Sequence, residues 1–109
     1  MTIAATELPG SPKDILVDWQ RSDQDNLLIK WSAPQTEPAS LITGYLLEID
    51  DGNGGQFALA YDGSQDNNNL EALVSVTSGL QYRFRAFAVN FNGVSQPSVI
   101  ASYYACTAP

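Results

Sequence analysis

The side chains best suited to chemistry in this sequence are carboxylates, since twelve Asp and Glu face five Lys and Arg, for a net charge of −7. One group of oxygen-bearing side chains lies in the middle of the chain: Asp50, Asp51, Asn53, Asp62 and Asp66. Calcium takes roughly six to eight oxygen ligands, and paired carboxylates serve as acid and base in glycoside hydrolysis. The spacing is not that of an EF-hand loop, and no pocket is predicted around these residues. Solvated turns are therefore the favoured interpretation, with no metal and no catalytic residue predicted.

Aromatic side chains offer a second kind of site. Exposed rings at Trp19, Tyr61, Tyr103 and Tyr104 would suit stacking against a sugar. A two-residue rhythm buries about half of such rings, and none is flanked by an obvious polar cluster, which favours ordinary packing. Cys106 is either a half-buried strand residue or a cross-link to a neighbouring module. The first is favoured, because a single thiol is weak evidence.

Composition excludes several classes of function. The absence of His removes Ser-His-Asp and Cys-His catalysis and His-ligated zinc. One Cys allows no internal disulfide. An acidic surface repels phosphate, so neither nucleic acid nor an anionic membrane is an expected partner. No apolar run approaches the ~20 residues of a membrane span, and no signal-peptide core is present. We therefore expect a non-enzymatic domain without a cofactor.

The elements that would position these residues are short strands. The 109 residues suit one domain, and clusters of turn-forming residues divide them into short runs. Within the runs, apolar and polar residues alternate with period two, the pattern of strands with one buried face. The runs are 15–19, 27–31, 42–50, 56–61, 70–76, 80–90 and 99–106. Seven such strands predict an all-β antiparallel sandwich of two sheets.

The two ends differ from this pattern. Residues 1–8 lack periodicity and are expected to form a flexible leader. The domain is expected to span 9–106. Residues 107–109, Thr-Ala-Pro, are interpreted as the start of an inter-domain linker, because they resemble the Pro-containing segment that precedes the first strand.

Three segments carry a family resemblance. Residues 27–34, LLIKWSAP, hold a Trp with a following Pro, and residues 42–48, ITGYLLE, hold a Tyr in a strand. The third combines Val76 with 82–90, YRFRAFAVN, and then Gly93, Ser95 and Pro97. Together they resemble the fibronectin type III family over roughly residues 9–105. The resemblance implies an immunoglobulin-like Greek-key sandwich with sheets of three and four strands, and a core containing Trp31, Tyr45 and Tyr82.

Two details of that fold are predicted separately. Tyr82 begins a strand, so its ring can be buried while its hydroxyl bonds a backbone group a few residues upstream. The fifth strand leaves two alternatives. Its own alternation buries Ala72 and Val74, whereas the family register would bury Leu73.

Charges predict the register between the third and sixth strands. If these strands are antiparallel neighbours, their outward residues pair as Asp50 with Arg83, Glu48 with Arg85 and Leu46 with Phe87. In this register acidic residues face basic ones, and apolar residues face apolar ones. Cross-strand pairs contribute roughly 0.2–1 kcal/mol each, and exposed ion pairs lie at the low end of that range.

The candidate partner-binding surface comprises Leu46, Phe87, Val89, Phe91 and Asn92. The first three would form an apolar patch on the outer face of the second sheet. Phe91 would be either a recognition tip or, as we expect, packed on the base of its loop. That loop lacks the Arg-Gly-Asp that the family can carry there.

The resemblance implies a structural or adhesive protein-interaction module, one monomeric bead of a larger tandem-repeat protein, bound to neighbouring domains or a protein ligand. An alternative is a carbohydrate-binding or spacer module attached to a secreted hydrolase. An engineered scaffold is disfavoured, because the loops are rich in Asp, Asn and Gly rather than Tyr and Ser. Family habit places such a module outside the cell or on its surface, while the lack of disulfides leaves the cytoplasm open.

Overall fold

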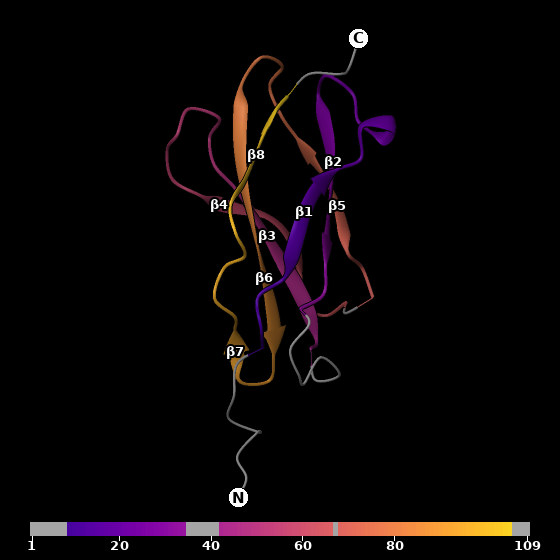
Figure 1. Cartoon of the computed structure of the whole chain (residues 1–109), viewed down its shortest axis with the longest axis vertical. Coiled ribbons are helices and arrows are strands. Elements are labelled where there is room, and N and C mark those ends of the chain that lie inside the picture. The colour runs from indigo at the N-terminus through magenta and orange to yellow at the C-terminus, as the bar shows by residue number, and fades with distance from the viewer. Residues whose placement is uncertain (1–8, 35–41, 67, 106–109) are drawn as a thin grey trace, which may run out of the picture.

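The computed structural model describes residues 9–34, 42–66 and 68–105, which form two antiparallel sheets packed face to face (Figure 1). The first sheet has the order β1-β2-β5, and the second has the order β4-β3-β6-β7, with β8 also paired to β6. The strands are β1 (Lys13–Val17), β2 (Asn26–Ser32), β3 (Gly44–Ile49), β4 (Ala58–Gly63), β5 (Glu71–Ser75), β6 (Gln81–Asn90), β7 (Gly93–Val94) and β8 (Ala101–Tyr104). The predicted all-β sandwich is confirmed.

The first predicted strand ends earlier than expected. Trp19 lies outside β1 and begins the 3-10 turn η2 (Trp19–Arg21). Asp18 caps this turn, because its Oδ1 accepts a hydrogen bond from the backbone N–H of Gln20 at 3.2 Å. The acidic residue before Trp19 therefore ends the strand and turns the chain.

The last predicted strand is shorter than expected and begins at Ala101. Pro97, which has no N–H to donate, lies in the interruption between β7 and β8. Two serine hydroxyls stand in for missing strand carbonyls: Ser95 Oγ accepts from the Ala88 N–H, and Ser98 Oγ accepts from the Ala86 N–H, both at 2.9 Å. The second sheet thus has a divided edge made of β7 and β8, where a single strand over 99–106 was predicted, and within the described residues it contains five strands rather than four.

Trp31, Tyr45 and Tyr82 lie in one continuous core between the sheets, as predicted. Their exposed fractions are 3%, 3% and 6%. The Trp31 ring lies 6.2 Å from the Tyr45 ring and 5.8 Å from the Tyr61 ring, measured between centroids. The largest completely buried side chains come from three strands: Phe84, Leu27, Ile29 and Leu47. The two-residue rhythm therefore sets the inner faces of both sheets.

The alternation of the fifth strand decides between its two predicted registers. Ala72 and Val74 are buried, while Leu73 is 60% exposed. Ala72 pairs with Ile29 in β2, and Ile29 is completely buried. Ala72 consequently faces the core, and the register taken from the family is wrong for this strand.

The predicted tyrosine corner is present. The Tyr82 hydroxyl accepts a hydrogen bond from the backbone N–H of Thr77 at 2.8 Å, which ties the crossover between the sheets to the start of β6.

We expect Tyr82→Phe to lower the free energy of unfolding by about 1 kcal/mol, because the Thr77 N–H loses its partner while the ring stays buried. Tyr104→Phe is the matched control. Its ring is 58% exposed, so the change should stay within about 0.5 kcal/mol. Urea denaturation of both variants measures the difference, and equal losses would contradict the role of the corner.

The register predicted between the third and sixth strands is confirmed. Leu46 pairs with Phe87 and Glu48 with Arg85 across β3 and β6. Glu48 Oε1 lies 2.7 Å from Arg85 Nε, and Asp50 Oδ2 lies 2.7 Å from Arg83 Nε. Asp50 was predicted on the outer face, but its side chain is completely buried. The correction has a physical reason, developed with the site below.

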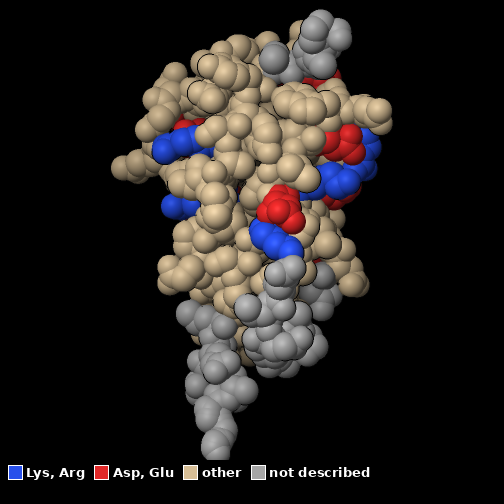
Figure 2. Space-filling view, in the orientation of Figure 1, with Lys and Arg blue, Asp and Glu red and all other residues tan. Residues whose placement is uncertain are grey.

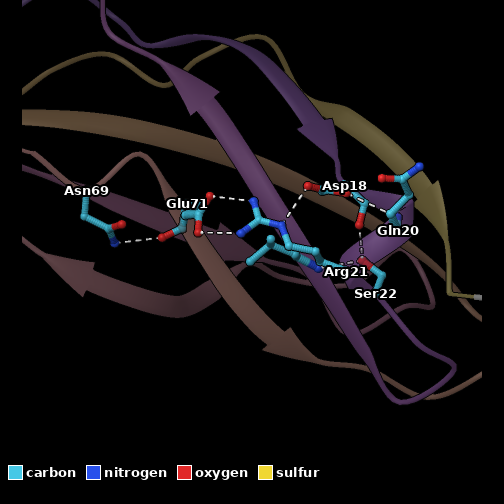
Figure 3. Close-up of polar contacts among 7 residues, drawn as sticks. Asp18, Gln20, Arg21, Ser22, Asn69 and Glu71 are labelled. Atoms are coloured by element: carbon cyan, nitrogen blue, oxygen red, sulfur yellow. Dashed lines mark hydrogen bonds and ion pairs between the residues drawn. The ribbon is translucent and has the colours of Figure 1, made fainter.

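Arg21 joins the 3-10 turn to the edge strand β5 (Figure 3). Its Nε bonds Asp18 at 2.8 Å, and its two terminal nitrogens bond the two Glu71 carboxylate oxygens at 3.3 and 2.9 Å. The hydrogen bond from Arg21 lowers the pKa of Asp18, and the bond to Glu71 contributes most to raising the pKa of Arg21. The Arg21 guanidinium, bound to both Asp18 and Glu71, therefore holds η2 against the first sheet.

Candidate partner-binding surface

The row of Leu46, Phe87 and Val89 lies on the outer face of the second sheet. Side chains of β6 alternate strictly: those facing the core are buried, and the intervening ones are partly buried. Leu46 is opposite Phe87, and Val89 is opposite both Gly44 and Val94. The structure thus brings the predicted apolar row together, with each member only partly exposed.

Phe91 was expected to pack on the base of its loop, and that expectation is wrong. The residue is 89% exposed. The buried Asn90 side chain holds the turn, because its Oδ1 accepts from the N–H of Asn92 at 2.8 Å and of Gly93 at 3.2 Å. So tight a turn leaves no room for residue 91 to fold back. Phe91 and the exposed Asn92 therefore project from the end of β6.

An arginine and aromatic stack continues the outer face beyond the apolar row. The Arg85 guanidinium carbon lies 4.1 Å from the Phe57 ring centroid and 5.5 Å from that of Phe87. Arg83 lies 4.9 Å from the Phe57 centroid. Cation–π contacts of this kind favour Arg over an aromatic face. Phe57 was missed from the sequence, although its place two residues from Leu59 within an alternating run was a usable signal.

Asp50 is buried because it closes a bend rather than lying flat on the sheet. Its Oδ1 accepts from the backbone N–H of Gly52 at 3.1 Å and of Arg83 at 3.0 Å, and its Oδ2 accepts from Arg83 Nε. Burial alone would raise the pKa of Asp50, but the hydrogen bonds from Arg83 and Gly52 outweigh it, so the pKa is lowered. The carboxylate is a structural acceptor rather than a free ligand.

The other members of the acidic set also cap turns. Asp51 Oδ1 accepts from the N–H of Asn53 at 2.8 Å and of Gly55 at 2.9 Å, and these bonds lower the pKa of Asp51. Asp62 accepts from the Ser64 N–H and Asp66 from the Asn68 N–H. Among the described residues, no three His, Cys, Asp or Glu side chains gather as metal ligands would.

The aromatic residues considered for sugar stacking are separated by the fold. Tyr61 is partly buried and packs against Trp31 of the core. Trp19 and Tyr103 meet edge to face, with 79° between their ring planes, and Tyr103 donates its hydroxyl proton to the Ile15 carbonyl. A stacking platform needs coplanar exposed rings, and these residues do not form one.

A second apolar area was missed from the sequence. It lies where β1 and the segment before β8 approach each other, and a groove of about 330 Å³ there is lined by Pro12, Ile15, Ile100 and Ala101 among others. Val99, which also lines the groove, is 88% exposed, and Leu16 in β1 is 57% exposed. A two-residue rhythm marks which residues share a face, but it carries no signal for an uncovered edge.

Most charged side chains on the visible face lie in small clusters that contain both signs (Figure 2). Figure 2 shows basic side chains lying beside acidic ones, separated by wide areas without charge. The four ion pairs of the described residues use Arg21, Arg83 and Arg85. Cys106, the leader 1–8 and the linker residues 107–109 lie outside the described residues.

No protein-family model matches the sequence. A curated relative, the chicken (Gallus gallus) fibronectin type-III domain-containing protein 3a, is 33% identical over 81 residues, which is 73% of this chain and 6% of that protein. The chain belongs to the fibronectin type III domain family. The fold agrees, since the solved fourth fibronectin type III domain of a human protein superposes with a TM-score of 0.80 at 22% identity, covering 98% of this chain and 87% of that one.

Larger proteins contain domains of the same fold. The twitchin kinase region from C. elegans superposes with a TM-score of 0.77 at 22% identity, covering 92% of this chain and 17% of that chain. This fibronectin type III domain thus spans a small fraction of its chicken relative and of the twitchin structure. Within its described residues, no helix is long and apolar enough to cross a membrane.

Proposed function

We propose that this fibronectin type III domain is a non-catalytic structural and protein-binding module, one bead of a larger protein with several domains. The observation that carries the proposal is the position of Ser11 and Ala105, which lie near the first and last of the described residues. Ser11, near the start of the described residues, bonds the Gln96 carbonyl beside β7, whereas Ala105 bonds Leu80 at the opposite end of the sandwich (Figure 1). Domains attached before and after this one would then lie at opposite ends of the sandwich, in a linear arrangement.

The contact with the preceding domain is proposed to use Phe91 and Asn92. Their turn adjoins β7, at the end where the chain enters the sandwich. Leu46, Phe87 and Val89 continue that apolar surface along β3 and β6. An exposed aromatic side chain on a rigid turn is the kind of anchor that interfaces use. The preceding domain or another protein ligand is therefore the proposed partner.

Adhesive function, tandem repetition and an extracellular or cell-surface location are part of the same proposal. The relatives support it only as examples, since one solved relative is the fourth such domain of its protein. Carbohydrate binding is not favoured, because Tyr61 packs against Trp31 and the rings of Trp19 and Tyr103 lie 79° apart, which leaves Tyr104 without a coplanar partner among them.

A tandem of two copies tests the proposed contact, with Pro109 of the first copy followed directly by Pro9 of the second. We expect amide chemical shifts of residues 90–93 in the second copy to differ from those of the isolated domain. Phe91→Ser in the second copy should abolish the difference. The same substitution in the first copy, whose corresponding turn faces solvent, is the control and should leave it unchanged. Identical shifts in tandem and isolated domain would overturn the proposed surface.

A further inference from the structure

Two Asn-Gly pairs lie in turns of the second sheet. Asn53-Gly54 connects β3 to β4, and Asn92-Gly93 connects β6 to β7. Both Asn residues are exposed. An Asn before Gly is chemically labile, because glycine has no Cβ to hinder its backbone nitrogen as that nitrogen approaches the Asn side-chain carbonyl carbon. By sequence alone the two sites are equivalent.

The structure makes the two glycine nitrogens different. The Gly93 N–H donates to the buried Asn90 Oδ1 at 3.2 Å, within the paired turn between β6 and β7. The Gly54 N–H has no hydrogen-bond partner in the described part of the chain. A Cβ built at Gly54 would meet no atom within 4 Å, so the surroundings are open. The Gly93 nitrogen is therefore held by a hydrogen bond, whereas the Gly54 nitrogen is free to attack the side chain of the preceding Asn.

We propose that Asn53 is a spontaneous modification site that converts to aspartate and isoaspartate, and that Asn92 is protected. The deprotonated Gly54 nitrogen attacks Cγ of Asn53, and a new C–N bond forms as Nδ2 leaves, protonated, as ammonia. Water then opens the cyclic imide at either carbonyl. The net reaction consumes one water, releases one ammonia and exchanges the side-chain amide for a carboxylate, in either the normal or the isoaspartyl linkage.

The modification would act on the Asp50 and Arg83 pair. Asp51 Oδ1 holds the N–H groups on both sides of Gly54, and Arg83 Nη2 donates to the Gly55 carbonyl at 2.8 Å. A new carboxylate at residue 53 adds negative charge beside Asp51. The isoaspartyl form also lengthens the backbone within the turn that presents the Gly55 carbonyl. Conversion therefore loosens one anchor of the Arg83 side chain.

The test follows the folded chain in mildly alkaline buffer, with peptide mapping by mass spectrometry and isoaspartyl methyltransferase labelling. We expect Asn53 to convert at least about fivefold faster than Asn92, the factor that one hydrogen bond of about 1 kcal/mol supplies. Asn53→Gln should remove most of the conversion, and Asn92→Gln should leave it nearly unchanged.

Concentrated urea supplies the control for local sequence. In the unfolded chain both glycine nitrogens are free, so the two rates should converge. Equal rates in the folded protein, or faster conversion at Asn92, would overturn the proposal. A rate difference that persists unchanged in urea would also overturn it, because the fold would then not be its cause.

Discussion

Trp31→Ala is expected to lower the free energy of unfolding by about 3–5 kcal/mol, the cost of removing a large aromatic side chain from a packed core. Trp31 is 3% exposed and contacts Tyr45 and Tyr61 from the facing sheet. Its removal leaves a cavity between the sheets that neighbouring rings fill only in part. Urea denaturation followed by far-ultraviolet circular dichroism measures the loss, since that signal does not depend on the deleted fluorophore.

Trp19→Ala is the matched control, because it deletes the same side chain from the surface. Trp19 is 40% exposed and packs edge to face with Tyr103. Its loss should cost no more than about 1 kcal/mol. If the two tryptophan variants were equally stable, the assignment of Trp31 to the centre of the sandwich would be wrong.

The second large effect is expected for Asp50→Ala, at about 2–4 kcal/mol. The substitution removes the acceptor for the Gly52 N–H, the Arg83 N–H and the Arg83 side chain at once. Glu48→Ala is the control. It breaks the neighbouring ion pair between Glu48 and Arg85, whose side chains are 26% and 31% exposed, and should cost no more than about 1 kcal/mol. If Asp50→Ala and Glu48→Ala lowered the free energy of unfolding equally, burial of the Asp50 carboxylate would add nothing to the stability.

At low pH the stabilisation that the ionised Asp50 side chain provides should be lost. Its pKa in the folded state is lowered below the ordinary 3.8, so the unfolded chain takes up the proton first as the pH falls. The stabilisation is therefore complete above the unfolded value and is lost as the pH falls through the folded value. The difference in stability between wild type and Asp50→Ala should be constant near neutral pH and should shrink below pH 3.8. A difference that grew in acid would contradict the lowered pKa.

The features predicted correctly depend on alternation and on charge. Trp31 and Tyr82 share an interior because a period of two assigns whole faces, and Glu48 meets Arg85 because only one register pairs every outward charge. Alternation also gave burial of Ala72 and Val74 as one of the two alternatives for the fifth strand, and the structure decides for it against the family register. Patterns repeated over several residues were thus enough to place the strands and their inner faces.

What could not be predicted depends on single contacts. Phe57 belongs to an alternating run visible in the sequence, but its contact with Arg85 does not follow from cross-strand pairing. Asp50 is buried because a bend turns its carboxylate toward backbone N–H groups. Phe91 is exposed because Asn90 tightens the turn. Each outcome is decided by local hydrogen-bond geometry, which the residue types leave open.

The divided edge of the second sheet affects how such domains behave when crowded together. An unbroken border strand offers a row of amides and carbonyls on which a neighbouring chain can build. Here Ser95 and Ser98 turn their hydroxyls inward to β6, and Pro97 between them has no amide hydrogen. Like domains held at high local concentration are therefore poorly matched for extending the second sheet across this edge.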